Sequence, residues 1–173
     1  MDFLHHVDSP LGGITLASDG EALIGCWFDG QRFFARTLDT DRAEAALPVF
    51  DRTERWLETY FSGRAPDFTP PLRPRGTPFQ RAVWEVLLTI PWGCTLSYGE
   101  IGARLPVPCA SARAVGSAVG RNPVSLIIPC HRAVGADGRL TGYAGGLERK
   151  AALLGLERNK SVTKFSQVLD RWR

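Results

Sequence analysis

The segment from Ile127 to Gly135, IIPCHRAVG, places a thiol, an imidazole and a guanidinium side by side at the end of an apolar run. A cysteine attacks an electrophilic carbon as its thiolate, and a neighbouring base or cation promotes that ionised form. His131 adjoins Cys130, but neighbours in an extended chain point to opposite faces, so their pairing requires a turn or a bridging water. The two residues alone fit a structural role as well as a catalytic one.

A histidine that acts as a base is usually oriented by a carboxylate on its second ring nitrogen. Downstream of His131 the candidates are Asp137, Glu148 and Glu157, and their spacing does not choose among them. The elements between them must therefore decide which carboxylate, if any, reaches the imidazole.

Composition and cysteine usage restrict the class of protein. The chain has 173 residues, of which 44% are hydrophobic and 23% charged, as in ordinary globular domains. No apolar stretch approaches the ~20 residues of a membrane span, and no basic segment followed by an apolar one opens the chain, so we expect a cytoplasmic location. The cysteines form no C-x-x-C pair, which argues against zinc and favours free thiols; they are Cys26, Cys94, Cys109 and Cys130.

Charge is distributed unequally along the chain. Residues 1–76 carry 8 Lys or Arg against 12 Asp or Glu, whereas residues 77–173 carry 13 against 6. The basic second half indicates a polyanion as partner, and a well-solvated surface is the alternative explanation.

The first half predicts a sheet followed by a helix. Residues 3–28 read as a β-meander, because strand-prone segments alternate with Ser-Pro, Gly-Gly and Asp-Gly turns. Residues 42–61 predict a helix that Gly63 ends, with Pro48 as the alternative, later start. The Pro- and Gly-rich residues 65–76 predict a linker. We therefore expect an N-terminal antiparallel β-sheet subdomain with a helix over residues 1–75.

Helices dominate the second half. Thr77, Pro78 and Gln80 form a capping box with proline at the first helical position, and Ser97 and Glu100 repeat the box before a shorter helix. Another short helix, rich in small residues, follows over residues 109–123. Two short helices joined by a turn predict a helix-turn-helix, and the fold class is α+β.

Arg113 is an exception on the small-residue helix, because its side chain is long and charged. Ala112, Ala114 and Gly116 surround it and would allow the backbone to approach a narrow minor groove closely. The alternative is a surface arginine that covers its neighbours.

The remaining segments are a short apolar run, a glycine-rich loop and a closing helix. Residues 124–128 predict a short buried strand or extended segment, and the loop at 133–146 holds one aromatic residue, Tyr143. That loop suits a flat ligand, or is simply a surface loop. An amphipathic helix ends near Glu157, and a basic tail follows over residues 159–173, as a docked short helix or a phosphate-binding arm.

Several motifs together resemble one known family. NPVSLIIPCHRAVG at 122–135 follows SYGEIGARL at 97–105 and SARAVGSAVGRNP at 111–123, and it precedes GYAGGLERKAALLGLE at 142–157. In order and spacing these motifs closely resemble the O6-alkylguanine-DNA alkyltransferases, in particular the free-standing bacterial type. The likeness covers residues 76–158, the expected C-terminal domain, and DSPLGGITLASDG at 8–20 is similar to the family's opening strands.

The resemblance implies a set of catalytic roles. Cys130 would accept the alkyl group from guanine O6 in a single, irreversible turnover. His131 would act as its base through a water, oriented by Glu157, and Asn122 would be the turn residue beside this network. The family needs no cofactor, and the zinc ligands of some relatives have no counterparts here, so we expect no metal.

The resemblance also implies how DNA is held. The partner would be double-stranded DNA containing alkylated guanine, and also O4-alkylthymine, bound through its minor groove by a monomer that extrudes the base. Tyr98 would donate to guanine N3 and help to rotate the phosphate, while Arg113 would fill the vacated stack. The carbonyls of Ile128 and Val134 would read guanine's hydrogen-bond donors. Tyr143 and the backbone amides that follow it, beginning with Ala144, would border the alkyl pocket, to which Pro129 also belongs.

Two other functions are compatible with parts of the sequence. A non-catalytic binder of alkylated DNA would lack the acceptor cysteine, and Cys130 is present. A Cys-His hydrolase would need an oxyanion loop that the sequence does not display, and it would have no use for the small-residue helix.

Overall fold

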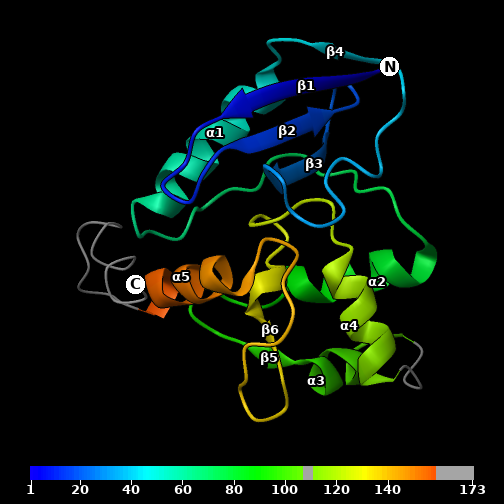
Figure 1. The fold of residues 1–173 in the computed structure, drawn as a ribbon, viewed down its shortest axis with the longest axis vertical. Helices are drawn as coiled ribbons and strands as arrows, with labels where there is room; N and C mark the ends of the chain where they lie inside the picture. The colour runs from blue at the N-terminus through cyan, green and yellow to red at the C-terminus, as the bar shows by residue number, and fades with distance from the viewer. Residues whose placement is uncertain (107–110, 159–173) are drawn as a thin grey trace.

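The computed structural model describes residues 1–106 and 111–158. A sheet with one helix forms one layer, and the remaining helices gather below it (Figure 1). The elements in chain order are β1 Asp2–Val7, β2 Ile14–Ser18, β3 Leu23–Phe28, β4 Arg42–Glu44, α1 Pro48–Phe61, α2 Pro78–Leu88, β5 Leu96–Ser97, α3 Tyr98–Ala103, α4 Ala112–Gly120, a 3-10 turn Cys130–Arg132, β6 Ala133–Val134 and α5 Leu147–Arg158. Cys109 and the tail over residues 159–173 lie outside the described residues.

The N-terminal sheet has the strand order β3-β2-β1-β4. The expected antiparallel meander is confirmed for β1, β2 and β3. The sheet as a whole is nevertheless mixed, because β4 pairs in parallel with β1. The prediction of a helix start at residue 42 was therefore wrong, because residues 42–44 extend the sheet edge. The alternative start is confirmed: α1 begins at Pro48, whose missing N–H suits a first helical position.

The segment expected as a linker runs along the sheet. The amide of Leu23 donates to the carbonyl of Pro71 at 2.7 Å, and the amide of Arg73 donates to the carbonyl of Leu23 at 2.9 Å. These bonds satisfy backbone groups of β3 that would otherwise lie at a sheet edge. The connection to the second half is therefore attached to the sheet.

Both expected capping boxes are present. Thr77 and Gln80 cap α2, and Ser97 and Glu100 cap α3, each with the reciprocal pair of hydrogen bonds. Helix α3 packs against α4, and both contact α2. Nothing in the sequence indicated the small parallel sheet of β5 and β6, which joins the start of α3 to the residues after Cys130.

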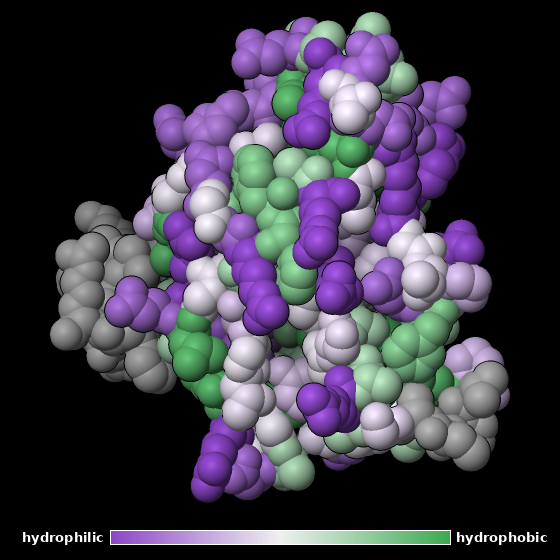
Figure 2. All heavy atoms as spheres, turned by 45° about the vertical axis from the view of Figure 1, so that its right-hand side comes forward, coloured by the Kyte–Doolittle hydropathy of each residue, from purple (hydrophilic) through white to green (hydrophobic). Residues whose placement is uncertain are grey.

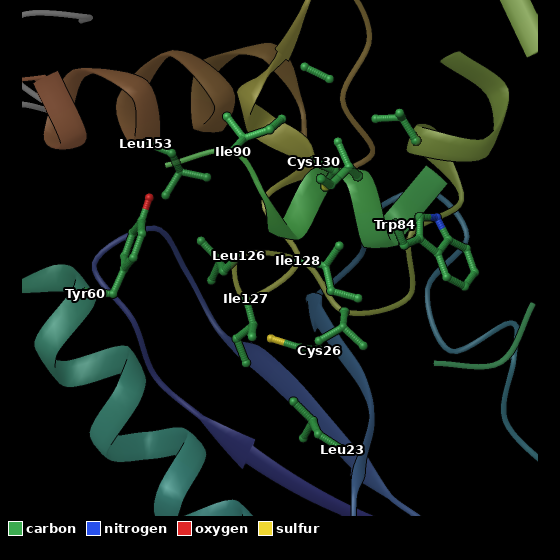
Figure 3. Packing of buried hydrophobic residues seen from close by; sticks show 14 of the residues in the cluster. Leu23, Cys26, Tyr60, Trp84, Ile90, Leu126, Ile127, Ile128, Cys130 and Leu153 are labelled. Carbon is green, nitrogen blue, oxygen red and sulfur yellow. The ribbon is translucent and has the colours of Figure 1, made fainter. Parts of the chain in front are cut away.

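One hydrophobic core extends through both layers. It includes Leu23 from β3, Trp84 from α2 and Leu153 from α5 (Figure 3). The two halves are also joined through their backbones, because the amide of Cys26 donates to the carbonyl of Pro123 and the amide of Ser125 donates to the carbonyl of Cys26, each at 2.8 Å. The second half of the chain is thus hydrogen-bonded directly to the backbone of β3.

Two further expectations are corrected. Residues 124–128 form no regular strand, only an isolated bridge between Cys26 and Val124, and Leu126 turns the chain with a φ of 72°. Helix α5 is not exposed along one face as an amphipathic surface helix would be, because it is buried on most sides from Lys150 to Glu157. The turn at Leu126 precedes the 3-10 turn at Cys130, which packs against α5.

The face shown in Figure 2 is mainly hydrophilic, with small hydrophobic areas between charged side chains. Within residues 1–106 and 111–158, no helix has the length and apolar character needed to cross a membrane.

Candidate functional site

A cavity of about 190 Å³ brings together residues that are distant in sequence. Cys130 lies in its wall, opposite parts of α3, α4 and the glycine-rich loop. The lining residues are Arg32, Phe33, Tyr98, Gly116, Ser117, Val119, Gly120, Arg121, Cys130, Gly142, Tyr143 and Ala144. The cavity thus contains one nucleophile, two tyrosines and a wall of small residues.

Two tight turns position Cys130. Pro129, with φ −80° and ψ 66°, is the centre of an inverse γ-turn in which the amide of Cys130 donates to the carbonyl of Ile128 at 2.8 Å. The 3-10 turn of Cys130–Arg132 then follows at once. Because this backbone is not extended, adjacent side chains need not point to opposite faces. Pairing of Cys130 with its neighbour His131 requires a turn or a bridging water, and the 3-10 turn is such a turn.

Glu157 is the carboxylate that reaches the imidazole. Its Oε1 lies 2.7 Å from Nε2 of His131, and both side chains are fully buried. Asp137 instead pairs with Arg139 in an exposed turn, and Glu148 is exposed in the first turn of α5. Nδ1 of His131 makes no hydrogen bond within the described residues, so this nitrogen is the one available to take a proton.

Glu157 accepts hydrogen bonds from two further side chains. Arg132 donates through Nε and Nη2 to its two oxygens, each at 2.9 Å, and the hydroxyl of Tyr60 donates to Oε1 at 2.8 Å. Burial opposes ionisation of this carboxyl, but His131 and Arg132 more than offset burial and lower its pKa to about 2. Glu157 is therefore a fixed anion behind the imidazole.

Sequence reasoning missed Tyr60, which comes from α1 in the other half of the chain. Its ring is fully buried and its hydroxyl points toward the end of α5 (Figure 3). The residue belonged to the apolar face of the expected helix, and nothing in a single sequence connects it to a carboxylate 97 positions away. Sequence reasoning also missed the role of Arg132, although it adjoins the Cys-His pair. The sequence does not show that this arginine is buried against Glu157.

Burial sets the protonation states at the site. It raises the pKa of the Cys130 thiol, although a hydrogen bond from Asn122 and the charge of Lys150 oppose the shift. It lowers the pKa of His131, although Glu157 opposes that shift. At neutral pH the site therefore holds a thiol beside a neutral imidazole, and the thiolate forms only if a base removes the proton.

Asn122 fixes the chain that leads to Cys130. Its Nδ2 donates to the carbonyls of Ile128 at 2.8 Å and Val124 at 3.3 Å, and its Oδ1 accepts from the amide of Val124 at 3.0 Å. The buried side chain of Asn122 therefore hydrogen-bonds to both ends of the irregular segment 124–128, where a strand was expected.

Lys150 is a second residue that sequence reasoning missed. It is fully buried, and its ammonium donates to the carbonyls of Ala133 at 2.6 Å, Thr141 at 3.0 Å and Gly142 at 3.1 Å. Burial lowers its pKa to about 8. The sequence did contain a signal for this role, because Lys150 lies among the apolar residues of α5. Buried lysines are rare unless they are paired.

Of the other expected pocket residues, Tyr98, Tyr143 and Ala144 line the cavity, whereas Pro129 and Val134 are not among its lining residues. Tyr98 donates from its hydroxyl to the carbonyl of Thr141 at 2.8 Å. The hydroxyl of Tyr143 is buried and has no hydrogen bond to the described residues. Val134 is buried in β6 opposite Ser97, and the carbonyl of Ala144 accepts from the amide of Arg32 at 3.1 Å.

The small-residue helix α4 presents its first turn to solvent. Ser111 caps it, and Ala112, Arg113 and Ala114 are exposed, while Gly116 lines the cavity. Arg113 is therefore an exposed side chain on the same helix as Gly116, which lines the cavity. Within residues 1–106 and 111–158, no group of three His, Cys, Asp or Glu side chains is arranged to hold a metal ion.

Two family models match the chain in succession. The 6-O-methylguanine DNA methyltransferase, ribonuclease-like domain matches residues 4–74, and the 6-O-methylguanine DNA methyltransferase, DNA binding domain matches residues 78–159. Together they account for nearly all of the described residues.

Individual relatives agree with these matches. A methylated-DNA–protein-cysteine methyltransferase of Mycobacterium bovis is 45% identical over 157 residues, which cover 90% of this chain and 92% of the relative. One of Haemophilus influenzae is 43% identical over 160 residues, covering 92% and 88%.

Among solved structures, Mycobacterium tuberculosis OGT in complex with DNA superposes with a TM-score of 0.84 at 43% identity, covering 97% of this chain and 99% of the other. An O6-methylguanine DNA methyltransferase of Methanococcus jannaschii gives a TM-score of 0.63 at 27% identity, with 91% and 95% covered.

Proposed function

Because the chain belongs to the 6-O-methylguanine DNA methyltransferase family and is a DNA-repair methyltransferase, we propose that Cys130 is the cysteine that takes the methyl group. One observation carries this assignment: Cys130 lines the cavity while the buried His131–Glu157 pair stands beside it. The other described cysteines lack this setting. Cys26 is buried, with its pKa raised by desolvation, and Cys94 is exposed and lines no part of this cavity.

The proposed reaction is a direct displacement. His131 removes the thiol proton through a bridging water, and the sulfur attacks the methyl carbon in line with its bond to guanine O6. The C–O bond breaks, a thioether forms on Cys130, and the guanine takes up a proton as it leaves. Glu157 stabilises the imidazolium formed in the first step, as a buried anion hydrogen-bonded to its other nitrogen. Since the thioether is not removed, each molecule reacts once.

We propose that α4 enters the minor groove of double-stranded DNA. The exposed Ala112 and Ala114 allow close approach, and Arg113 occupies the space left by the extruded base. Extrusion costs a few kcal/mol, and a side chain that fills the stack lowers that cost. Tyr98 and Tyr143, with the backbone around Pro129, Val134 and Ala144, would enclose the base. We further propose that the protein acts as a monomer in the cytoplasm, and that O4-alkylthymine is a second substrate.

The experiment is the intact mass of the protein after incubation with a duplex that contains one O6-methylguanine. We expect a gain of one methyl group per molecule, located on Cys130 by peptide mapping, with no further repair after one equivalent. Cys130→Ser should gain nothing while still binding the duplex.

Other outcomes would reassign the function. A methyl group on Cys26, Cys94 or Cys109 would move the acceptor. Binding without any mass gain would fit a non-catalytic DNA binder, and repeated turnover without a stable adduct would fit a hydrolase.

A further inference from the structure

Three arginines converge on one aromatic ring that lines the cavity. The guanidinium carbons of Arg121, Arg32 and Arg36 lie 4.7, 4.8 and 5.6 Å from the ring centroid of Phe33. Arg32 and Arg36 belong to the loop between β3 and β4, whereas Arg121 ends α4. Loop and helix come from opposite halves of the chain, so the cluster exists only in the folded protein.

These cations have no anionic partner among the residues that the structure describes. Across residues 1–106 and 111–158, none of the three guanidinium groups takes part in an ion pair, and all three side chains are exposed. An aromatic face offsets only a small part of the mutual repulsion of like charges. A planar guanidinium binds a phosphate through two parallel hydrogen bonds, so an arginine cluster of this kind suits a phosphate group.

The backbone holds this cluster in a fixed place. Phe33 has a φ of 61°, a left-handed conformation that side chains other than glycine rarely adopt. The amide of Arg32 donates to the carbonyl of Ala144 at 3.1 Å, which ties the loop to the wall of the cavity. A backbone outlier of this kind persists only where the surroundings enforce it, and such outliers gather at functional sites.

The cluster and the nucleophile share one cavity. Arg32, Phe33 and Arg121 line it together with Cys130. A nucleotide whose base lies in the cavity must leave its phosphates at the mouth, because the sugar joins them directly to the base. Arg32 and Arg121 are exposed and line the cavity, and Arg36 lies over the same Phe33 ring, so their guanidinium groups are close to where such phosphates would be.

We propose that Arg32, Arg36 and Arg121 form a phosphate-binding rim that holds the DNA backbone beside the extruded nucleotide. This proposal rests on the function proposed above, since it takes the target base to lie next to Cys130. It makes the loop at 29–41 part of the DNA interface, although the first half of the chain is acidic overall. DNA binding would then use residues of both halves.

The test compares a substrate that has phosphates with one that has none. Arg32→Gln, Arg121→Gln and the double variant are measured with a duplex containing O6-methylguanine and with the free base O6-benzylguanine. Arg52→Gln is the matched control, because Arg52 is an exposed arginine of α1 that has no ion pair with any described residue and does not line the cavity. Duplex affinity is measured between 50 and 200 mM salt.

We expect each rim variant to bind the duplex about fivefold more weakly, the upper value for an exposed ion pair. The slope of log affinity against log salt should become shallower by about 0.9 for each phosphate that the variant no longer neutralises. The rate with O6-benzylguanine should fall far less than the duplex affinity, because this free base carries no phosphate. An unchanged melting temperature shows that the variants are folded. Phe33→Leu, which removes the ring but keeps the arginines, should weaken duplex binding in the same direction.

Three results would overturn the proposal of a phosphate-binding rim. The first is an unchanged salt slope in the double variant; the second is an equal loss in Arg52→Gln, which would reflect net charge alone. The third is an equal loss of rate with free O6-benzylguanine, which would make these residues part of the pocket wall. Absence of methyl transfer by the wild-type protein would instead overturn the proposed function, so the two failures are distinguishable.

Discussion

Glu157→Gln should destabilise the protein strongly, because the side chain does more than orient His131. Its carboxylate neutralises Arg132, which is only 9% exposed and donates two hydrogen bonds to it. The glutamine keeps the shape but removes the charge, so the guanidinium becomes a buried cation without a partner. Breaking a buried pair in this way typically costs about 3–5 kcal/mol.

The pKa of the carboxyl gives a similar magnitude. It lies at about 2 in the folded protein, against an ordinary value of 4.5. At ~1.4 kcal/mol per unit, the folded state gains about 3 kcal/mol from ionised Glu157. Because the folded pKa is the lower one, this gain is complete above about pH 4.5 and is lost as the pH falls toward 2. For a chain of this size the melting temperature of Glu157→Gln should fall by roughly 6–12 °C at pH 7.

The assay is urea unfolding of the wild type and Glu157→Gln from pH 7 to pH 3. We expect the two stability curves to approach each other as the pH falls below about 4.5. The unfolded wild type then binds a proton at Glu157 while the folded state still holds it ionised, and the variant has no carboxyl to titrate. The double variant Glu157→Gln, Arg132→Met is the control for the mechanism. It should be about 1–2 kcal/mol more stable than Glu157→Gln, since no unpaired charge remains, although the carbonyl of Ile90 loses its donor.

Alkyl transfer is measured on the same variant at a temperature where it is folded. The rate at neutral pH should fall, and it should recover partly toward pH 9.5 as the thiolate forms without help. Either of two results would refute this role of Glu157: a Glu157→Gln variant as stable as the wild type at pH 7, or two pH–rate profiles that superimpose.

Three further substitutions test other parts of the site. Tyr60→Phe should lower stability by about 2 kcal/mol in urea unfolding, because a buried hydrogen bond to a charged oxygen is removed; an unchanged value would make the hydroxyl irrelevant. Lys150→Met should raise the pKa of Cys130 further, seen as a shift of the alkyl-transfer pH profile to higher pH; a shift to lower pH would contradict this role. Arg113→Ala should slow repair of a duplex at least tenfold while leaving the reaction with O6-benzylguanine intact, and equal losses on both substrates would make Arg113 a structural residue.

Helix starts and turns could be predicted from the sequence, because capping and turn formation depend on residues that are close together in the chain. Thr77 with Gln80, and Ser97 with Glu100, predicted two helix starts that the structure contains. The Ser-Pro, Gly-Gly and Asp-Gly signals predicted the meander of β1 to β3. The start of α1 was misplaced because residues 42–44 carry no strong local preference, and pairing with β1 decides their conformation.

Long-range partners could not be read in this way. Spacing along the chain left Asp137, Glu148 and Glu157 open as partners of the imidazole, and the family resemblance implied Glu157. The packing of α5 against the turn at Cys130 brings Glu157 to 2.7 Å from the ring. Tyr60 reaches the same carboxylate from the other half of the chain. Such contacts depend on how elements pack, which no spacing along the chain specifies.

The sequence by itself determined the reactive pair, its family resemblance and the helix that carries Arg113, because these are contiguous patterns of residue types. The tertiary structure decided the protonation state of the site and the neighbours of its cavity. Burial makes Cys130 a thiol, and Glu157 stays an anion because the charged Arg132 and the hydrogen-bonded His131 are packed beside it. The three arginines around Phe33 likewise meet only when the loop at 29–41 folds against the end of α4, since electrostatic environment is a property of three-dimensional proximity.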